Sequence, residues 1–214
     1  MADFNVGLVG AGTVGGGVVK IFAKQKSFFA RGLDLSVALK RIVDTRAKRF
    51  EELPVNSAIC SGDVDDILRD DEIQIVIELV GGTGFAKEFM LRALAAKKHV
   101  ITANKALLAL HGPEIFEAAE KNGVSVYFEA SVGGGMPAIK TIREAMIANE
   151  IRSVKTIING TCNYILTRME KDNLSFEDAL RRAQQIGFAE ADPTMDIGGF
   201  RNDITGSTNP NRLQ

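Results

Sequence analysis

The stretch FNVGLVGAGTVG, residues 4–15, decides the fold. Its first six residues form a short, mostly apolar run, which predicts a buried strand. In the glycine pattern that follows, Gly10 permits a tight turn, Gly12 lets the backbone approach a pyrophosphate, and Gly15 lets the next helix pack closely on the strand. The N-terminus of that helix would offer free N–H groups to phosphates. The stretch therefore predicts a dinucleotide-binding turn. The alternative is a glycine-rich turn without a ligand.

Outward from this stretch, apolar strands alternate with single helices. We predict further strands at residues 35–43, 73–80, 99–102 and 124–129, and helices at residues 85–96 and 113–122. Strands joined by single helices favour right-handed crossovers and a parallel, doubly wound sheet. The fold class is therefore α/β, with a sheet of the Rossmann type.

The sequence pattern changes near Met136, where helices flank a β-rich stretch at 151–158. The final stretch, 198–214, has the composition of a loop or a disordered tail. We therefore expect three parts. They are a Rossmann domain over 1–135, part of an α+β substrate and dimerisation domain over 136–200, and a divergent, disordered tail over 201–214.

The bulk composition excludes several classes of protein. Lys and Arg number 26 against 27 Asp and Glu, so the net charge of −1 gives no overall field to attract nucleic acid or an anionic membrane. No apolar window is long enough for a membrane span, and the N-terminus lacks the pattern of a signal peptide. Cys60 and Cys162 are too few for a disulfide scaffold or a zinc site. We expect a cytoplasmic protein with buried free thiols.

Charged residues follow the second predicted strand. Asp44 occupies the place where dinucleotide-binding domains hold the adenosine ribose, and its charge favours NAD. Arg46, Lys48 and Arg49 come directly afterwards. They could bind the 2′-phosphate of NADP or form a solvated basic turn, so these residues leave the choice between NAD and NADP open.

Three more loops follow predicted strands, and such ends form the ligand crevice of a parallel sheet. The glycine turn that begins at Gly81 could pass close to a nicotinamide ribose or be a flexible loop. Lys105 could hold a carboxylate, polarise a carbonyl or lie against the nicotinamide, with a surface lysine as the alternative. Glu129 precedes a triple-glycine loop, and such a loop could wrap a hard cation with oxygen ligands or act as a hinge.

Together these segments resemble homoserine dehydrogenase. The matching motifs are GAGTVG at 10–15, ELVGG at 78–82, TANKALLA at 102–109, EASVGGGMP at 129–137, NGTCNYIL at 159–166 and GFAEADPTMDI at 187–197. The resemblance implies an NAD(P)-dependent oxidoreductase that interconverts L-homoserine and L-aspartate 4-semialdehyde in the biosynthesis of threonine, methionine and isoleucine. It also implies a homodimer.

The resemblance assigns roles to individual residues. Cofactor contacts would come from Gly10, Gly12, Thr13, Val14, Lys105 and Gly187, in addition to Asp44 and Gly81, which are predicted from their positions after strands. Lys105 would also lie beside the substrate as a catalytic residue, while Glu190 and Thr161 would bind the substrate, Glu190 through its amino group. A monovalent cation, sodium, would be held by Glu129 and by the backbone of Val132, Gly134 and Met136.

The sequence departs from the family pattern near its end. The family has an aspartate and a proton-donating lysine where this chain has Arg201 and Thr205. A threonine hydroxyl is too weak an acid to replace an ammonium as the donor to an alkoxide. We expect a truncated or frameshifted chain with an unrelated tail. The alternative is a natural, inactive NAD(P)-binding paralogue or assembly subunit. Either predicts cofactor binding with very little dehydrogenase activity.

Another oxidoreductase of aspartate-derived substrates is the second enzyme class to consider. An aspartate dehydrogenase would use the same nucleotide fold, whereas a semialdehyde dehydrogenase would need a nucleophilic cysteine in the crevice. Cys162 lies in a motif where the homoserine dehydrogenases often have threonine, so we interpret it as a neutral replacement.

Overall fold

The structure is a computed structural model that describes residues 4–24, 36–154, 160–189, 193 and 197. The chain divides into two compact units, Met1–Ser131 and Val132–Gln214, and each is described by itself. The predicted boundary between residues 135 and 136 stays a prediction. Among the described residues, no helix has the length and apolarity needed to cross a bilayer.

The first unit is built on a parallel sheet of six strands in the order β3-β2-β1-β4-β5-β6. The strands are β1 Phe4–Val9, β2 Val37–Val43, β3 Cys60–Ser61, β4 Ile75–Glu78, β5 His99–Thr102 and β6 Val126–Tyr127. The strand order reverses between β1 and β4, and open α/β sheets bind ligands at such a switch point. This topology confirms the predicted doubly wound α/β sheet.

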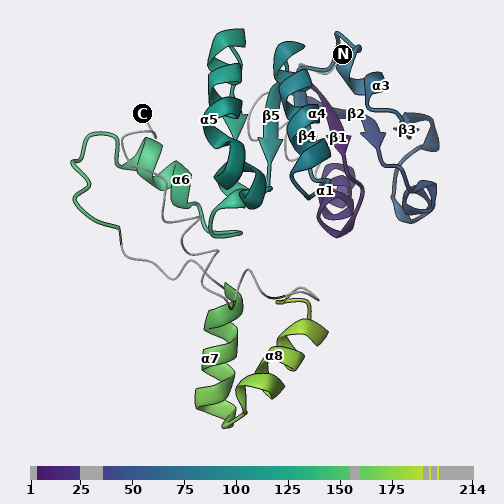
Figure 1. The fold of residues 1–214 in the computed structure, drawn as a ribbon. Coiled ribbons are helices and arrows are strands. Elements are labelled where there is room, and N and C mark those ends of the chain that lie inside the picture. The colour runs from purple at the N-terminus through teal and green to yellow at the C-terminus, as the bar shows by residue number, and fades with distance from the viewer. Residues whose placement is uncertain (1–3, 25–35, 155–159, 190–192, 194–196, 198–214) are drawn as a thin grey trace. The chain divides into compact units, whose positions relative to one another are not determined.

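Helices cover both faces of this sheet. They are α1 Thr13–Lys24, α3 Asp65–Leu68, α4 Gly84–Ala95 and α5 Lys105–Asn122, with short 3-10 helices at Ala47–Glu52, Ser57–Ile59 and Glu129–Ser131. Figure 1 shows α4 and α5 side by side, and Phe89 and Ile115 from these helices share one buried core with Val76 of β4. Val19 of α1 packs in a second core with Ile77. Neighbouring residues of β4 therefore face opposite layers, as strand geometry requires.

Helix α5 is longer than predicted. The sequence places Pro113 in a first helical turn, but α5 begins at Lys105 and contains Pro113 in its interior. The Asn104 side chain accepts a hydrogen bond from the Leu107 N–H at 3.1 Å, so the helix has an earlier N-cap. Buried contacts of Leu107 and Ile115 outweigh the local disadvantage of the proline.

The second unit contains a helical hairpin. Its described elements are α6 Ala138–Lys140, a π-helical turn Thr141–Ala145, α7 Gly160–Asp172 and α8 Phe176–Gln185. Ile165 of α7 packs against Ala179 and Ala183 of α8. The predicted β-rich stretch at 151–158 is wrong for residues 151–154, which form no strand because no described segment pairs with them. The rest of that stretch and the predicted tail at 201–214 lie outside the described residues.

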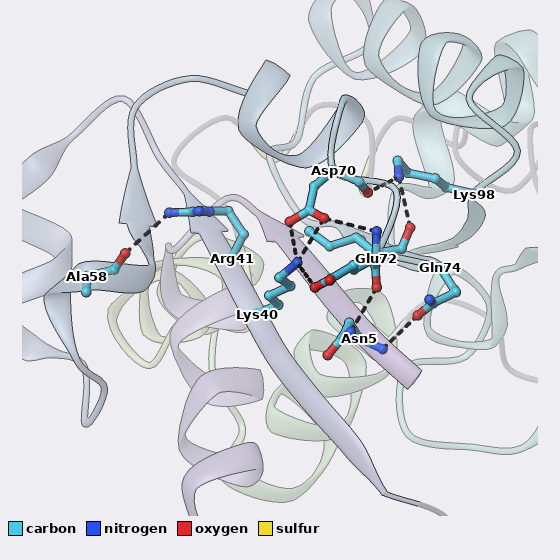
Figure 2. Close-up of polar contacts among 9 residues, drawn as sticks. Asn5, Lys40, Arg41, Ala58, Asp70, Glu72, Gln74 and Lys98 are labelled. Carbon is cyan, nitrogen blue, oxygen red and sulfur yellow. Dashed lines mark hydrogen bonds and ion pairs between the residues drawn. The ribbon is translucent and has the colours of Figure 1, made fainter. Parts of the chain in front are cut away.

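A polar cluster connects β1 and β2 with the segments that precede β4 and β5 (Figure 2). Lys40 of β2 forms ion pairs with Asp70 at 2.7 Å and Glu72 at 2.6 Å. Lys98 is almost completely buried and donates to the backbone carbonyls of Asp70 and Ile73, both at 2.8 Å. Burial lowers the pKa of the Lys98 ammonium. The cluster fixes the loop that leads into β4.

Candidate dinucleotide site

The turn between β1 and α1 requires its glycines for the backbone itself. Gly10 has a φ of 97°, and a Cβ there would lie 2.5 Å from the Leu79 carbonyl oxygen. A Cβ on Gly15 would lie 1.8 Å from the carbonyl oxygen of Gly10. A side chain at Gly10 would separate the turn from the end of β4, and a side chain at Gly15 would separate α1 from β1.

The first residues of α1 face solvent beside this turn. Thr13 and Val14 are exposed, and 59% of the Val14 surface is accessible. A helix of this length directs unsatisfied N–H groups and a partial positive charge out of its N-terminus. A Cβ on Gly12 would meet only the tip of the Arg49 side chain, at 3.3 Å. The backbone at Gly12 is therefore open to a bound anion.

Asp44 lies at the end of β2 and is almost completely buried, with 8% of its surface accessible. Its carboxylate accepts hydrogen bonds from the backbone N–H groups of Ala11 and Arg46, both at 2.9 Å, and from Arg49 Nη1 at 2.7 Å. Burial alone would raise the pKa of the Asp44 carboxyl. These donors outweigh burial, so the pKa lies below its ordinary value of 3.8. The carboxylate thus holds the glycine turn against the neighbouring strand.

The three basic residues after β2 differ in their surroundings. Arg49 is half-buried, paired with Asp44, and lies over Gly12 of the turn. Lys48 and Arg46 are exposed, and Arg46 Nε lies 3.7 Å from an Asp44 oxygen. The hypothesis of a solvated basic turn fits the exposed side chains of Lys48 and Arg46, whereas Arg49 packs against the glycine turn.

The loops after β4 and β5 lie on the other side of the switch point. Gly81 and Gly82 both have positive φ angles, 80° and 68°. The Asn104 amide donates a 2.7 Å hydrogen bond to the Gly82 carbonyl oxygen. Lys105 is the first residue of α5 and is exposed. The structure thus brings the predicted residues Gly81 and Lys105 to adjacent loops, which Asn104 connects.

A buried hydrogen-bond cluster beneath these loops was not predicted. The Glu78 side chain is fully buried; its Oε1 accepts the Val80 N–H at 2.8 Å and its Oε2 accepts the Thr102 hydroxyl at 2.7 Å. Thr102 Oγ1 also accepts the Asn104 N–H at 3.0 Å, and the Thr102 carbonyl oxygen accepts the Ser131 hydroxyl at 2.9 Å. A carboxyl group at the end of an otherwise apolar strand was the signal available in the sequence, since buried polar groups require partners.

The predicted cation ligands fall on both sides of the boundary between the two units. Glu129 opens a 3-10 helix in the first unit, while Val132, Gly134 and Met136 belong to the second. Gly134 has a φ of 64°. Among the described residues, no cluster of three or more His, Cys, Asp or Glu side chains could hold a metal ion. The cation site therefore stays a prediction.

In the second unit, Thr161 and the loop after α8 are in contact. Thr161 is buried and its hydroxyl donates to the Phe188 carbonyl oxygen at 2.8 Å. The Phe188 ring stacks on Tyr164 of α7 at 5.0 Å, and Gly187 permits the turn with a φ of 78°. The predicted residues Thr161 and Gly187 thus lie at the same end of the hairpin. Glu190, Arg201 and Thr205 lie outside the described residues.

Two family models match the chain. One, described as the NAD-binding domain of homoserine dehydrogenase, matches residues 10–129, and one described as homoserine dehydrogenase matches residues 137–203. The chain is 40% identical to a homoserine dehydrogenase of Bacillus subtilis over 94% of its own length and 46% of the relative's. It is 43% identical to one of Neisseria gonorrhoeae over 93% and 46%.

A solved structure is similar as well. The crystal structure of a homoserine dehydrogenase from Thiobacillus denitrificans has 42% sequence identity and a TM-score of 0.86, covering 94% of this chain and 46% of that one. The chain spans about half the length of the relatives that it matches.

Proposed function

The chain belongs to the homoserine dehydrogenase family, and we propose that its first unit binds NAD(P) across the switch point between β1 and β4. The observation that carries the proposal is the glycine turn, open at Gly12, with the N-terminus of α1 behind it and the buried Asp44 beside it. Gly10, Gly12, Thr13 and Val14 would hold the pyrophosphate, and Asp44 the adenosine ribose.

We further propose that the site accepts NADPH as well as NADH. A lone aspartate at this position would repel a 2′-phosphate. Here the Arg49 guanidinium pairs with Asp44 and retains further N–H donors on the side of Gly12. Arginine binds phosphate well because its planar group presents several donors. Arg49 would therefore contact the 2′-phosphate of NADPH, while Asp44 would accept the ribose hydroxyl of NADH.

For the whole protein we propose the oxidoreduction of L-homoserine and L-aspartate 4-semialdehyde. The bound cofactor would supply or accept the hydride. Lys105, at the start of α5 next to the Gly81 loop, would polarise the substrate carbonyl. Thr161, Gly187 and Glu190 would complete the substrate and cofactor contacts.

The remaining parts of the proposal rest on the resemblance. A sodium ion would be held by Glu129 and by the backbone of Val132, Gly134 and Met136. A homodimer in the cytoplasm would be the working form. Cys162 is half-buried on α7, and family membership favours its interpretation as a neutral replacement over a nucleophile.

The test is a titration of the 214-residue chain with NADH and NADPH, followed by nucleotide fluorescence, with and without homoserine. We expect both nucleotides to bind. Homoserine oxidation with NAD⁺ or NADP⁺ should be very slow, because Thr205 stands where the family has a proton-transferring lysine. Absence of binding by both nucleotides would refute the cofactor proposal, and robust turnover would refute the need for that lysine.

A further inference from the structure

We propose that Glu78, Thr102 and Ser131 position the loops that receive the nicotinamide half of the cofactor. The inference rests on the proposed binding of NAD(P). None of these three side chains needs to touch the cofactor. They would act by fixing the backbone of the loops that follow β4, β5 and β6.

The Glu78 side chain has no accessible surface, yet a carboxyl group is costly to bury and an apolar side chain would fill the same core more cheaply. No ion pair of the described residues includes Glu78. Its two carboxylate oxygens instead accept hydrogen bonds from the Val80 N–H and from the Thr102 hydroxyl. A polar group that does not add to core packing can instead specify one backbone geometry.

The connections of Thr102 show which geometry is specified. Its hydroxyl links Glu78 at the end of β4 to the Asn104 N–H after β5, and its carbonyl oxygen holds the Ser131 hydroxyl after β6. Asn104 in turn donates to the Gly82 carbonyl oxygen. One cluster therefore joins three consecutive loops at the carboxyl ends of the strands.

The glycine loop after β4 depends on this cluster. A Cβ at Gly81 or Gly82 would meet no atom within 4 Å, so the backbone there has little packing of its own. Both glycines have positive φ angles and a wide choice of conformations. The hydrogen bonds from the Val80 N–H to Glu78 and from Asn104 to Gly82 fix the two sides of this loop.

The position of the cluster in the sheet predicts which half of the cofactor it affects. The glycine turn and Asp44 follow β1 and β2, on one side of the switch point. The cluster follows β4, β5 and β6, on the other side. A dinucleotide bound across the switch point places its adenosine half on the first side and its nicotinamide half on the second. Loss of a hydrogen bond in this cluster should therefore weaken only the contacts with the nicotinamide half of the cofactor.

The test compares NADH with ADP-ribose, which lacks the nicotinamide, by isothermal titration of the full chain and two variants. Thr102→Val removes the hydroxyl at nearly constant volume, and Thr102→Ser keeps it as the matched control. We expect Thr102→Val to weaken NADH about tenfold and ADP-ribose less than about twofold, because only one half of the site loses its hydrogen bonds. Thr102→Ser should bind NADH within about threefold of the unchanged chain.

Equal weakening of both ligands, or no change in either, would overturn the inference while leaving the cofactor proposal intact. If the unchanged chain binds neither ligand, the cofactor proposal itself fails. Should Thr102→Val not fold, Ser131→Ala provides the second variant, since it removes only the hydrogen bond to the Thr102 carbonyl oxygen. It should weaken the binding of NADH at least about threefold more than the binding of ADP-ribose. The expected effect is smaller than that of Thr102→Val because only one hydrogen bond is removed. Equal binding losses would again overturn the inference.

Discussion

Arg49 is a half-buried cation shared between a carboxylate and the glycine turn. Replacing it by glutamine removes the charge that offsets Asp44 and the donors that we assign to a 2′-phosphate. We predict that Arg49→Gln weakens NADPH binding about tenfold or more, the size expected for one charged hydrogen bond, and leaves NADH within about threefold. Fluorescence titration with both nucleotides measures this change.

Lys48 provides the matched control for Arg49, because it is an exposed cation on the same 3-10 helix. Lys48→Gln removes the same charge and should change the preference between NADPH and NADH by less than about twofold, since exposed charges are well screened. Equal effects of the two substitutions would show that net charge, and not the position of Arg49, controls NADPH binding.

The low pKa of the Asp44 carboxyl links stability to pH. At pH values between the pKa of the folded chain and the ordinary pKa of 3.8, the unfolded chain binds more protons than the folded chain. The stabilisation by Asp44 is thus present above pH 3.8 and is lost as the pH falls through the folded pKa. We predict that Asp44→Asn flattens the acid dependence of the free energy of unfolding, measured by urea titration at several pH values.

Glu51→Gln serves as the control for this pH dependence, since Glu51 is an exposed carboxyl on the neighbouring 3-10 helix. The free energy of unfolding of this variant should depend on pH in the same way as that of the unchanged chain. An Asp44→Asn profile parallel to that of the unchanged chain would argue against the role assigned to Asp44.

At the scale of elements, helix α1 offers a comparison between two glycines. A Cβ on Gly15 would collide with the Gly10 carbonyl oxygen, whereas a Cβ on Gly17 would meet nothing within 4 Å. We predict that Gly15→Ala lowers the free energy of unfolding by about 1–3 kcal/mol through overpacking. Gly17→Ala should raise it by about 0.5–1 kcal/mol because alanine favours the helix. Denaturant unfolding measures the free energy of unfolding of both variants. Similar free energies for the two would contradict the close packing of α1 on β1.

The elements also show which features of the fold can be predicted from sequence patterns. The alternation of apolar runs and helices was sufficient to predict the parallel sheet, because strands buried on both faces are apolar throughout. It misplaced the start of α5 since a proline is a strong local signal, while the cap by Asn104 and the buried Leu107 depend on tertiary contacts. Predicted strand 124–129 shortens to Val126–Tyr127 because the chain turns into a 3-10 helix at Glu129.

The candidate site was predictable where function depends on backbone conformation. Gly10 and Gly15 can be identified from the sequence because a side chain at either position would collide with a backbone carbonyl group. The link from Glu78 to Ser131 was not predictable, since it joins residues far apart in the chain through buried hydrogen bonds. The pairing of Arg49 with Asp44 likewise follows from the fold and not from the run of basic residues.

On the scale of the whole molecule, the first unit, Met1–Ser131, contains the residues that we assign to the pyrophosphate and to the adenosine ribose. Gly12 offers the most direct test. An added Cβ would meet only the movable tip of Arg49, so the fold should persist, but it would lie where we propose that the pyrophosphate approaches the backbone.

The decisive measurement is an isothermal titration of NADH into the unchanged chain and into Gly12→Ala, with thermal unfolding to verify that both are folded. We predict saturable binding to the unchanged chain and binding at least about tenfold weaker to the variant. Equal affinities in two folded proteins would contradict the assignment of the glycine turn as the cofactor site.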